Sequence, residues 1–363
     1  MLRRRIDRLN DQVRALKLKL VIALFDHAPR PRGKIQRILF LRHDGKIGDS
    51  IVTSFLGHEL RRNYPEIESA VLISQNNLWT QPYFSGYSKT FVVKKGIWPS
   101  IRSALEIRKW KPDVVVNLAY DLKPKTAFFL CALDSQVISL SRQRLKAEVA
   151  EPRIDRSRVH FADQVVHCLE LLDLTKPVET TYRIQLPDAD MAQAQAFLDE
   201  QGMDRFVCLN LKASAALKGL SLQAAARVVA TIKTVLPEHQ ICFLGTREER
   251  SELNDAFGLD SKVKIAAGLS FAVQMAIVKK SDLIVTPDTS WVHVASAFAT
   301  PSVIIYRQED SAAMEFPSLV WAGRGANKRS LFAVGRADYK DEVDASTFSE
   351  TELQQAINAL FSK

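Results

Sequence analysis

The sequence predicts an α/β protein made of two domains, each a parallel sheet covered by helices. Apolar segments of strand length alternate with helical segments over residues 35–172, an order typical of parallel sheets. The alternation restarts at residue 190, after a stretch at 174–188 with few helical signals. At 363 residues the chain is long enough for two domains of ordinary size, each with its own core.

The first domain, which we place at residues 35–180, opens with an apolar strand and a long helix. The strand is expected at 35–41 and the helix from about residue 51 to residue 63. Further strands are expected at 69–74, 90–93, 113–118 and 136–140. The helices between and after them are expected at 100–109, 124–133 and 160–172.

The second domain, which we place at residues 181–363, repeats this pattern. Its strands are expected at 206–211, 240–244, 263–265, 283–285 and 302–306. Its helices are expected at 190–201, 221–235, 247–257, 270–279 and 350–361. Ser349 and Glu352 form a capping box at the start of the last helix.

Residues 1–34 form a basic segment that precedes both domains. They contain ten Lys/Arg and three Asp, a net charge of +7, so the other 329 residues carry only +2. The nearly neutral body argues against a broad nucleic-acid interface. Within the segment, apolar residues at helical spacing predict one stripe on an amphipathic helix: Leu2, Ile6, Leu9, Val13, Leu16 and Leu20.

Three interpretations of this helix remain open. It docks on its own body or pairs as a short coiled coil, it lies on an anionic membrane surface, or it contacts nucleic acid. Elsewhere no apolar run approaches the roughly 18 residues of a membrane-spanning helix, and no signal-peptide pattern opens the chain. The four cysteines are scattered, and Cys208 and Cys242 lie in apolar strands, which indicates buried thiols and a cytoplasmic location.

The most informative segment is residues 283–306, which predicts a strand, a polar turn, a helix and a second strand. The turn and the first helical turn contain Asp288, Thr289, Ser290 and His293. Ligands bind at this place in open α/β sheets, because the first N–H groups of the helix are unpaired. Helix capping alone also favours Asp, Thr and Ser here, but the histidine at this offset is more than a cap needs.

This segment resembles the Asp-Thr-Gly-x-x-His signature of the lipopolysaccharide heptosyltransferases, glycosyltransferase family 9. The resemblance implies the GT-B fold, two Rossmann-like domains facing across a cleft, and inverting transfer from ADP-heptose. It also implies that Asp288 binds hydroxyls of the donor sugar, that Thr289 and Ser290 hold the diphosphate, and that His293 faces the same groups. Ser290 stands where the family usually has glycine, so the backbone is expected to approach the diphosphate less closely.

A second candidate site lies in residues 42–50, between the first strand and its helix. Gly45 and Gly48 permit a tight turn, and Asp49 is near the helix start, where it serves either as an N-cap or as a general base. Gly48 and Asp49 match the Gly-Asp of the family, whose aspartate is the catalytic base. Asp44 is the alternative base, and Lys46 is a possible contact for acceptor carboxylate or phosphate groups.

Two further loops of the second domain resemble donor-binding parts of the family. The family has a lysine just before a helix, and this lysine stabilises the leaving diphosphate. Lys218 matches it best, and Lys212 is the alternative. Glu249 lies four residues after Gly245 and resembles the glutamate that binds the ribose or base, while its neighbour Glu248 keeps the register open by one. Solvent-facing lysines and first-turn glutamates are the ordinary alternatives.

The sequence therefore predicts an inverting glycosyltransferase with an N-terminal acceptor domain and a C-terminal nucleotide-sugar domain. The pair Asp188 and Asp190 opens a helix rather than following a strand, so we expect capping there and no required metal or other cofactor. The expected partners are ADP-heptose, a lipid-linked glycan acceptor and an anionic membrane surface for residues 1–34, without nucleic acid. A nucleotide-sugar epimerase or hydrolase of the same fold, or a weakly catalytic binding or assembly protein, remains the alternative.

Overall fold

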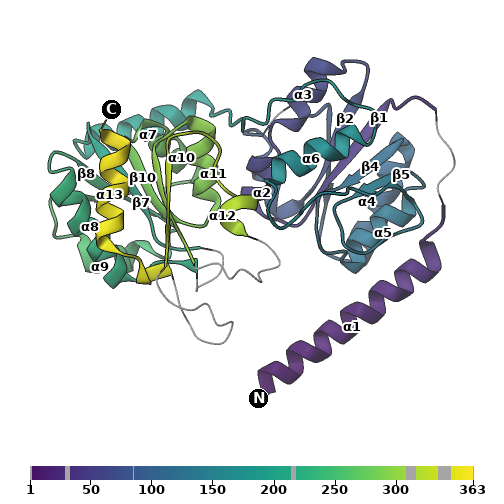
Figure 1. Cartoon of the computed structure of the whole chain (residues 1–363), viewed down its shortest axis with the longest axis horizontal. Helices are drawn as coiled ribbons and strands as arrows, with labels where there is room; N and C mark the ends of the chain where they lie inside the picture. Colours follow the sequence, from purple (N-terminus) through teal and green to yellow (C-terminus); the bar gives the residue numbers. More distant parts are fainter. Residues whose placement is uncertain are drawn as a thin grey trace. The chain divides into compact units, whose positions relative to one another are not determined.

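The computed structural model describes residues 2–28, 33–84, 86–213, 218–307, 316–333 and 345–362, and the chain forms two compact units (Figure 1). Unit 1 comprises Met1–Asp155 and Phe161–Thr180, and unit 2 comprises Arg156–His160 and Thr181–Lys363. The short segment Arg156–His160 thus folds with unit 2, although the chain on both sides of it belongs to unit 1.

Unit 1 contains a parallel sheet whose strand order is β3-β2-β1-β4-β5-β6. The strands are β1 (Arg37–Arg42), β2 (Glu68–Ser74), β3 (Lys89–Val93), β4 (Val114–Asn117), β5 (Gln136–Ser139) and β6 (Glu148–Ala150). The order reverses between β1 and β4, and ligands bind at the carboxyl ends of the strands beside such a reversal. The loop that follows β1 is therefore placed where a site is expected. The short edge strand β6 was not predicted.

The helices of unit 1 are α2 (Ile47–Val52), α3 (Leu56–Asn63), α4 (Ile97–Trp110), α5 (Pro124–Ala132) and α6 (Phe161–Glu170), with a 3₁₀ helix, η1 (Gln75–Thr80). The single helix predicted from residue 51 to 63 is wrong, because the chain breaks between α2 and α3. The hydroxyl of Thr53 donates to the Asp49 carbonyl, and that of Ser54 donates to the Ile51 carbonyl. Such back-bonding hydroxyls compete with helix continuation, and α2 consequently starts early enough to contain Asp49.

Unit 2 repeats the topology of unit 1, with the strand order β12-β11-β10-β7-β8-β9, all parallel. The strands are β7 (Phe206–Asn210), β8 (Gln240–Leu244), β9 (Val263–Ile265), β10 (Leu283–Pro287), β11 (Ser302–Tyr306) and β12 (Lys328–Phe332). Here the order reverses between β7 and β10, so the loops after these two strands share one edge. The edge strand β12 was not predicted.

The helices of unit 2 are α7 (Asp188–Glu200), α8 (Leu222–Val235), α9 (Arg250–Phe257), α10 (Phe271–Lys280), α11 (Ser290–Phe298), α12 (Pro317–Val320) and α13 (Glu350–Phe361), with a 3₁₀ helix, η3 (Ala345–Thr347). The predicted cap of α13 is confirmed, since the Glu352 N–H donates to the Ser349 hydroxyl at 3.3 Å. Asp188 and Asp190 lie in the first turn of α7, but the N-cap is Pro187 and no side-chain hydrogen bond caps the helix, so the predicted capping is wrong. Cys208 and Cys242 are buried as predicted.

The N-terminal helix α1 (Leu2–Phe25) packs on α5 through its C-terminal part. Leu18 is buried, Val21 and Ile22 pack beside it, and the rings of Phe25 and Phe128 meet edge-on at 5.8 Å. The docking interpretation is thus correct for this end, but the contacts are not those of the predicted stripe. No helix within the described residues is long and apolar enough to cross a membrane.

Replacing Leu18 with aspartate is expected to release α1 from α5, because burying one leucine side chain is worth about 1.5–3 kcal/mol. Trypsin cleavage at Lys17 and Lys19 should then accelerate about tenfold or more, as followed by mass spectrometry. The control is Leu20→Asp, which changes an exposed side chain two residues away. Equal cleavage rates in the two variants would contradict the docking contact.

Candidate active site

The loop after β1 gathers two aspartates around one buried arginine. Arg42, the last residue of β1, has only 3% of its surface exposed. Its Nη1 lies 3.6 Å from an Asp44 carboxylate oxygen and 3.4 Å from an Asp49 carboxylate oxygen. Gly45 joins the two aspartates and has a φ of +82°, a conformation that favours glycine. The predicted tight turn therefore brings Asp44 and Asp49 together.

Arg42 is the functional candidate that sequence reasoning missed. Its guanidinium lies over the ring of Phe161, 4.9 Å from the ring centroid. Its Nε and Nη2 are buried and have no hydrogen-bond partner among the described residues. A buried arginine so short of partners is costly, and its charge is balanced by the two carboxylates. An arginine that ends an apolar strand was the available signal.

The two carboxyl groups have opposite pKa shifts. The pKa of Asp49 is raised to about 6: burial is the largest cause, the negative charge and hydrogen bond of Asp44 act in the same direction, and Arg42 and Lys46 oppose the shift. Burial also disfavours ionisation of Asp44, but Arg42 and the Lys46 backbone N–H outweigh it and hold the pKa of Asp44 below its ordinary value. Asp49 is thus ionised at neutral pH yet binds a proton well, as a general base requires.

The other polar residues of this loop differ in what they can reach. The Lys46 ammonium lies 4.0 Å from Asp49, and its side chain is largely exposed. His43 is partly buried against Phe129 and lies within hydrogen-bond distance of the Thr126 hydroxyl. Burial and the nearby Lys125 lower the pKa of His43 to about 4. It is therefore neutral and packed, whereas Lys46 is free to meet an anionic ligand.

In unit 2 the loops after β7 and β10 meet in an ion pair. The Lys218 ammonium lies 2.6 Å from an Asp288 carboxylate oxygen, and the Asp288 side chain is mostly buried. Lys212, the competing lysine, instead pairs with Glu252 at 2.9 Å and lies 3.9 Å from Glu249. The two lysines thus lie at different positions along the edge of the sheet where the strands end: Lys218 is beside Asp288, and Lys212 is beside Glu252.

A buried polar network fixes the turn that carries Asp288. The Asn210 side-chain amide donates to the Thr286 hydroxyl at 3.2 Å and to the Lys212 carbonyl at 3.1 Å. The hydroxyls of Thr286 and Thr289 lie 3.1 Å apart, and that of Thr289 also accepts from the Trp291 N–H at 3.2 Å. Thr289 is therefore the N-cap of α11, and its hydroxyl is engaged in the protein. Asn210 was not singled out from the sequence.

Ser290 and His293 lie in the first turn of α11 and differ in burial. Ser290, the first helical residue, is partly exposed. His293 is buried edge-on against the ring of Tyr182, and its Nδ1 has no hydrogen-bond partner among the described residues. Burial lowers the pKa of His293 to about 4, with His160 adding to the shift and Asp288 opposing it. His293 is neutral at physiological pH, so it can offer a hydrogen bond but not a charge.

The cluster extends to three residues of unit 2 that are far apart in the sequence: His160, Tyr182 and Arg324. The Tyr182 hydroxyl and His160 Nε2 lie 3.1 Å apart. Arg324 Nη2 lies 3.0 Å from His160 Nδ1. Sequence reasoning did not single out His160 or Tyr182. Their roles depend on long-range packing within unit 2 that no local pattern indicates.

A pocket of about 480 Å³ opens between the loops after β7 and β8. Leucines line part of it, and its polar groups come from five residues: Lys212, Ser221, Gln223, Glu249 and Glu252. Glu249 is nearly buried and accepts from the Thr246 N–H at 2.6 Å, whereas Glu248 is exposed. Of the two glutamates, only Glu249 lines the pocket. The volume and the mixed lining suit a small organic ligand.

Comparisons with known proteins identify the family to which the chain is similar. The model of glycosyltransferase family 9 (heptosyltransferase) matches residues 131–321, more than half of the chain. An Escherichia coli (strain K12) protein, provisionally named lipopolysaccharide heptosyltransferase 4, is 20% identical over 327 residues, 88% of this chain and 87% of that protein.

Solved structures show the same fold. The glycosyl transferase family 9 structure from Veillonella parvula DSM 2008 has a TM-score of 0.77 at 19% identity and covers 93% of this chain and 99% of that chain. The Escherichia coli heptosyltransferase WaaC with ADP has a TM-score of 0.63 at 14% identity and covers 90% of this chain and 100% of that chain. The predicted GT-B fold is therefore confirmed.

The ion pair between Lys218 and Asp288 gives a binding prediction. Lys218→Met removes a cation and leaves the Asp288 carboxylate unpaired, and both changes oppose binding of a diphosphate. Affinity for ADP, measured by titration calorimetry, should fall about tenfold or more. Lys212→Met is the comparison variant: its ammonium pairs with Glu252 rather than with Asp288, so its loss should weaken ADP binding less. A larger loss in the Lys212 variant would reverse the assignment.

Proposed function

The chain belongs to glycosyltransferase family 9, the heptosyltransferase family, and we propose that it transfers heptose from ADP-heptose to a lipopolysaccharide core or related lipid-linked glycan. Asp49 is the general base of this reaction. The observation that carries the proposal is the cluster of Arg42, Asp44 and Asp49, in which burial, together with Asp44, raises the pKa of Asp49 toward neutrality although Arg42 opposes it. Such tuning is typical of catalytic groups.

The proposed reaction is a single displacement. The Asp49 carboxylate takes the proton of an acceptor hydroxyl. At the same time the oxygen of that hydroxyl forms a bond to the anomeric carbon of the donor sugar. The bond from that carbon to the diphosphate breaks, and the diphosphate leaves with the electron pair. Attack from the face opposite the leaving group inverts the anomeric configuration, with no covalent intermediate. Lys46, exposed beside the base, is a contact for anionic groups of the acceptor.

The donor is proposed to bind unit 2 at the edge where β7, β8 and β10 end. Asp288 accepts hydrogen bonds from sugar hydroxyls, while Lys218 and the N–H groups at the start of α11, Thr289 and Ser290, stabilise the diphosphate. The pocket lined by Glu249 has room for the nucleoside. The relatives support the choice of nucleotide, since WaaC was solved with ADP and with ADP-2-deoxy-2-fluoro heptose.

Lysine and helix N–H groups supply the positive charge that the leaving diphosphate needs, so the proposed reaction requires no metal or other cofactor. A neutral His293 adds a hydrogen bond to the same ligand. A lipid-linked acceptor implies that the enzyme works in the cytoplasm, at the inner face of the inner membrane. The nearly neutral body outside residues 1–34 gives nucleic acid no comparable role.

The decisive variants are Asp49→Asn and Asp44→Asn, which remove one carboxylate each with little change of shape. Asp49→Asn should lower kcat by about 10²–10⁴-fold, the range for loss of a general base, while affinity for ADP stays unchanged. Asp44→Asn should cost less, because Asp49 keeps its carboxylate. The assay follows ADP release from ADP-heptose with and without acceptor.

Three outcomes would contradict the proposal. A greater loss in the Asp44 variant would make Asp44 the base. Rapid turnover of the donor without acceptor would indicate a hydrolase or an epimerase. No loss in either variant would indicate a binding or assembly protein.

A further inference from the structure

Helix α1 has two apolar faces, and only one of them is covered. Leu18, Val21 and Ile22 pack toward α5. The second face consists of Val13, Leu16, Leu20 and Leu24, which we call the outer stripe. Its residues are spaced by three or four positions and therefore share one side of the helix. All four are exposed, Leu16 at 60% and Leu24 at 73% of their surface.

The N-terminal part of α1 extends beyond the part that packs on α5. Every side chain from Gln12 to Lys17 is exposed, and Figure 1 shows α1 leading away from the rest of unit 1 toward the N-terminus. Within the described residues nothing covers the outer stripe. A helical segment with exposed leucines and no packing partner is only marginally stable in water, so this arrangement indicates an external partner.

The charges beside the outer stripe identify that partner. Arg14, Lys17 and Lys19 are exposed, and no acidic residue occurs between Gln12 and Phe25. The sequence of the preceding turns continues the apolar spacing and adds four arginines against two aspartates, a further net positive charge. An apolar stripe bordered by cations matches a bilayer of anionic lipids, where the leucines enter the interface and the cations meet the headgroups. A second copy of the helix, paired along the same stripe, would bring these cations together.

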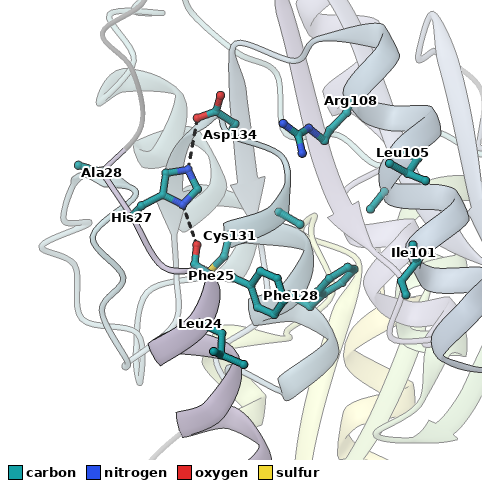
Figure 2. Close-up of a pocket in the computed structure, with 12 residues that line it drawn as sticks. Leu24, Phe25, His27, Ala28, Ile101, Leu105, Arg108, Phe128, Cys131 and Asp134 are labelled. Atoms are coloured by element: carbon teal, nitrogen blue, oxygen red, sulfur yellow. Dashed lines mark hydrogen bonds and ion pairs between the residues drawn. The ribbon is translucent and has the colours of Figure 1, made fainter.

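The exposed apolar surface continues from the outer stripe into unit 1. A groove of about 550 Å³ lies between the end of α1, α4 and α5. Figure 2 shows Leu24 and Phe25 on the α1 side of this groove and Ile101 and Leu105 on α4, with Arg108 close by. None of the proposed catalytic or donor-binding residues lines it, although it is larger than the Glu249 pocket. Most of its lining is apolar, as on the helix, and its charged residues are Arg108 and Asp134, the latter 3.4 Å from His27.

We propose that the outer stripe of α1 lies on an anionic membrane surface and that the opposite face of the helix, held by α5, fixes unit 1 to that surface. The contact is a peripheral one, made by side chains of the helix rather than by a membrane-spanning segment. It does not depend on the proposed transfer reaction.

The test is co-sedimentation of the full chain with vesicles of phosphatidylcholine, with and without phosphatidylglycerol. Binding should require phosphatidylglycerol and weaken with added salt. Leu16→Glu and Leu20→Glu should each weaken vesicle binding about tenfold or more, because each removes a leucine of the outer stripe that would be buried in the membrane interface. Ala15→Glu is the matched control: it makes the same charge change on the side of α1 away from the stripe and should have a smaller effect.

Equal binding to both kinds of vesicle, or equal losses in the Ala15 and Leu16 variants, would overturn the proposal. A concentration-dependent dimer that Leu16→Glu dissociates, with no vesicle binding, would overturn it in favour of a helix pair. Turnover with a water-soluble acceptor analogue should be the same in Leu16→Glu and in the natural chain. Failure of the membrane proposal is therefore distinguishable from failure of the catalytic one.

Discussion

The structure of unit 1 around its site depends on a single buried cation shared by two carboxyl groups. Arg42 ends a central strand, where burial removes it from water, and among the residues that the structure describes Asp44 and Asp49 balance its charge. The loop must therefore turn back at Gly45, and α2 must begin early enough to place Asp49 beside the guanidinium. The same constraint gives the two carboxyls different proton affinities, which converts a structural ion pair into a candidate acid–base group.

Unit 2 has the same topology and also brings opposite charges together at the carboxyl ends of its strands. Its strand order also reverses between two central strands, and the loops after them bring Lys218 and Asp288 together. The network of Asn210, Thr286 and Thr289 holds the turn that carries Asp288. In each unit an ion pair thus lies at the topological switch point, where open α/β sheets bind ligands. One of these ion pairs includes a carboxyl group of raised pKa, Asp49, and the other offers a cation, Lys218, beside a helix N-terminus.

Much of this arrangement could be predicted from the sequence because it follows local patterns. Apolar runs gave the central strands, and the polar residues after them gave Asp49 and Asp288. The edge strands β6 and β12 were missed because short, partly exposed strands have weak apolar patterns. The break after α2 was missed because hydroxyl back-bonding at Thr53 and Ser54 is a local choice that helix periodicity does not reveal.

The remaining misses involve contacts between distant parts of the chain. Arg42 and Asn210 look like ordinary polar residues at strand ends until tertiary packing buries them. For α1 the periodicity located an apolar stripe, but it could not tell which of two faces α5 covers. The predicted stripe is the face that α5 leaves uncovered, since its members Val13, Leu16 and Leu20 are exposed.

The most direct test of the account is the pH dependence of kcat/KM. A base that must be ionised, with a pKa of about 6, predicts a level rate above that pH and a decline of about tenfold for each pH unit below it. Because Arg42 lowers this pKa, Arg42→Met should move the decline to higher pH, whereas Arg42→Lys should move it less. A kcat/KM of the natural chain that stays level through pH 6 would contradict the role assigned to Asp49. So would a decline that occurs at the same pH in the natural chain and in both Arg42 variants.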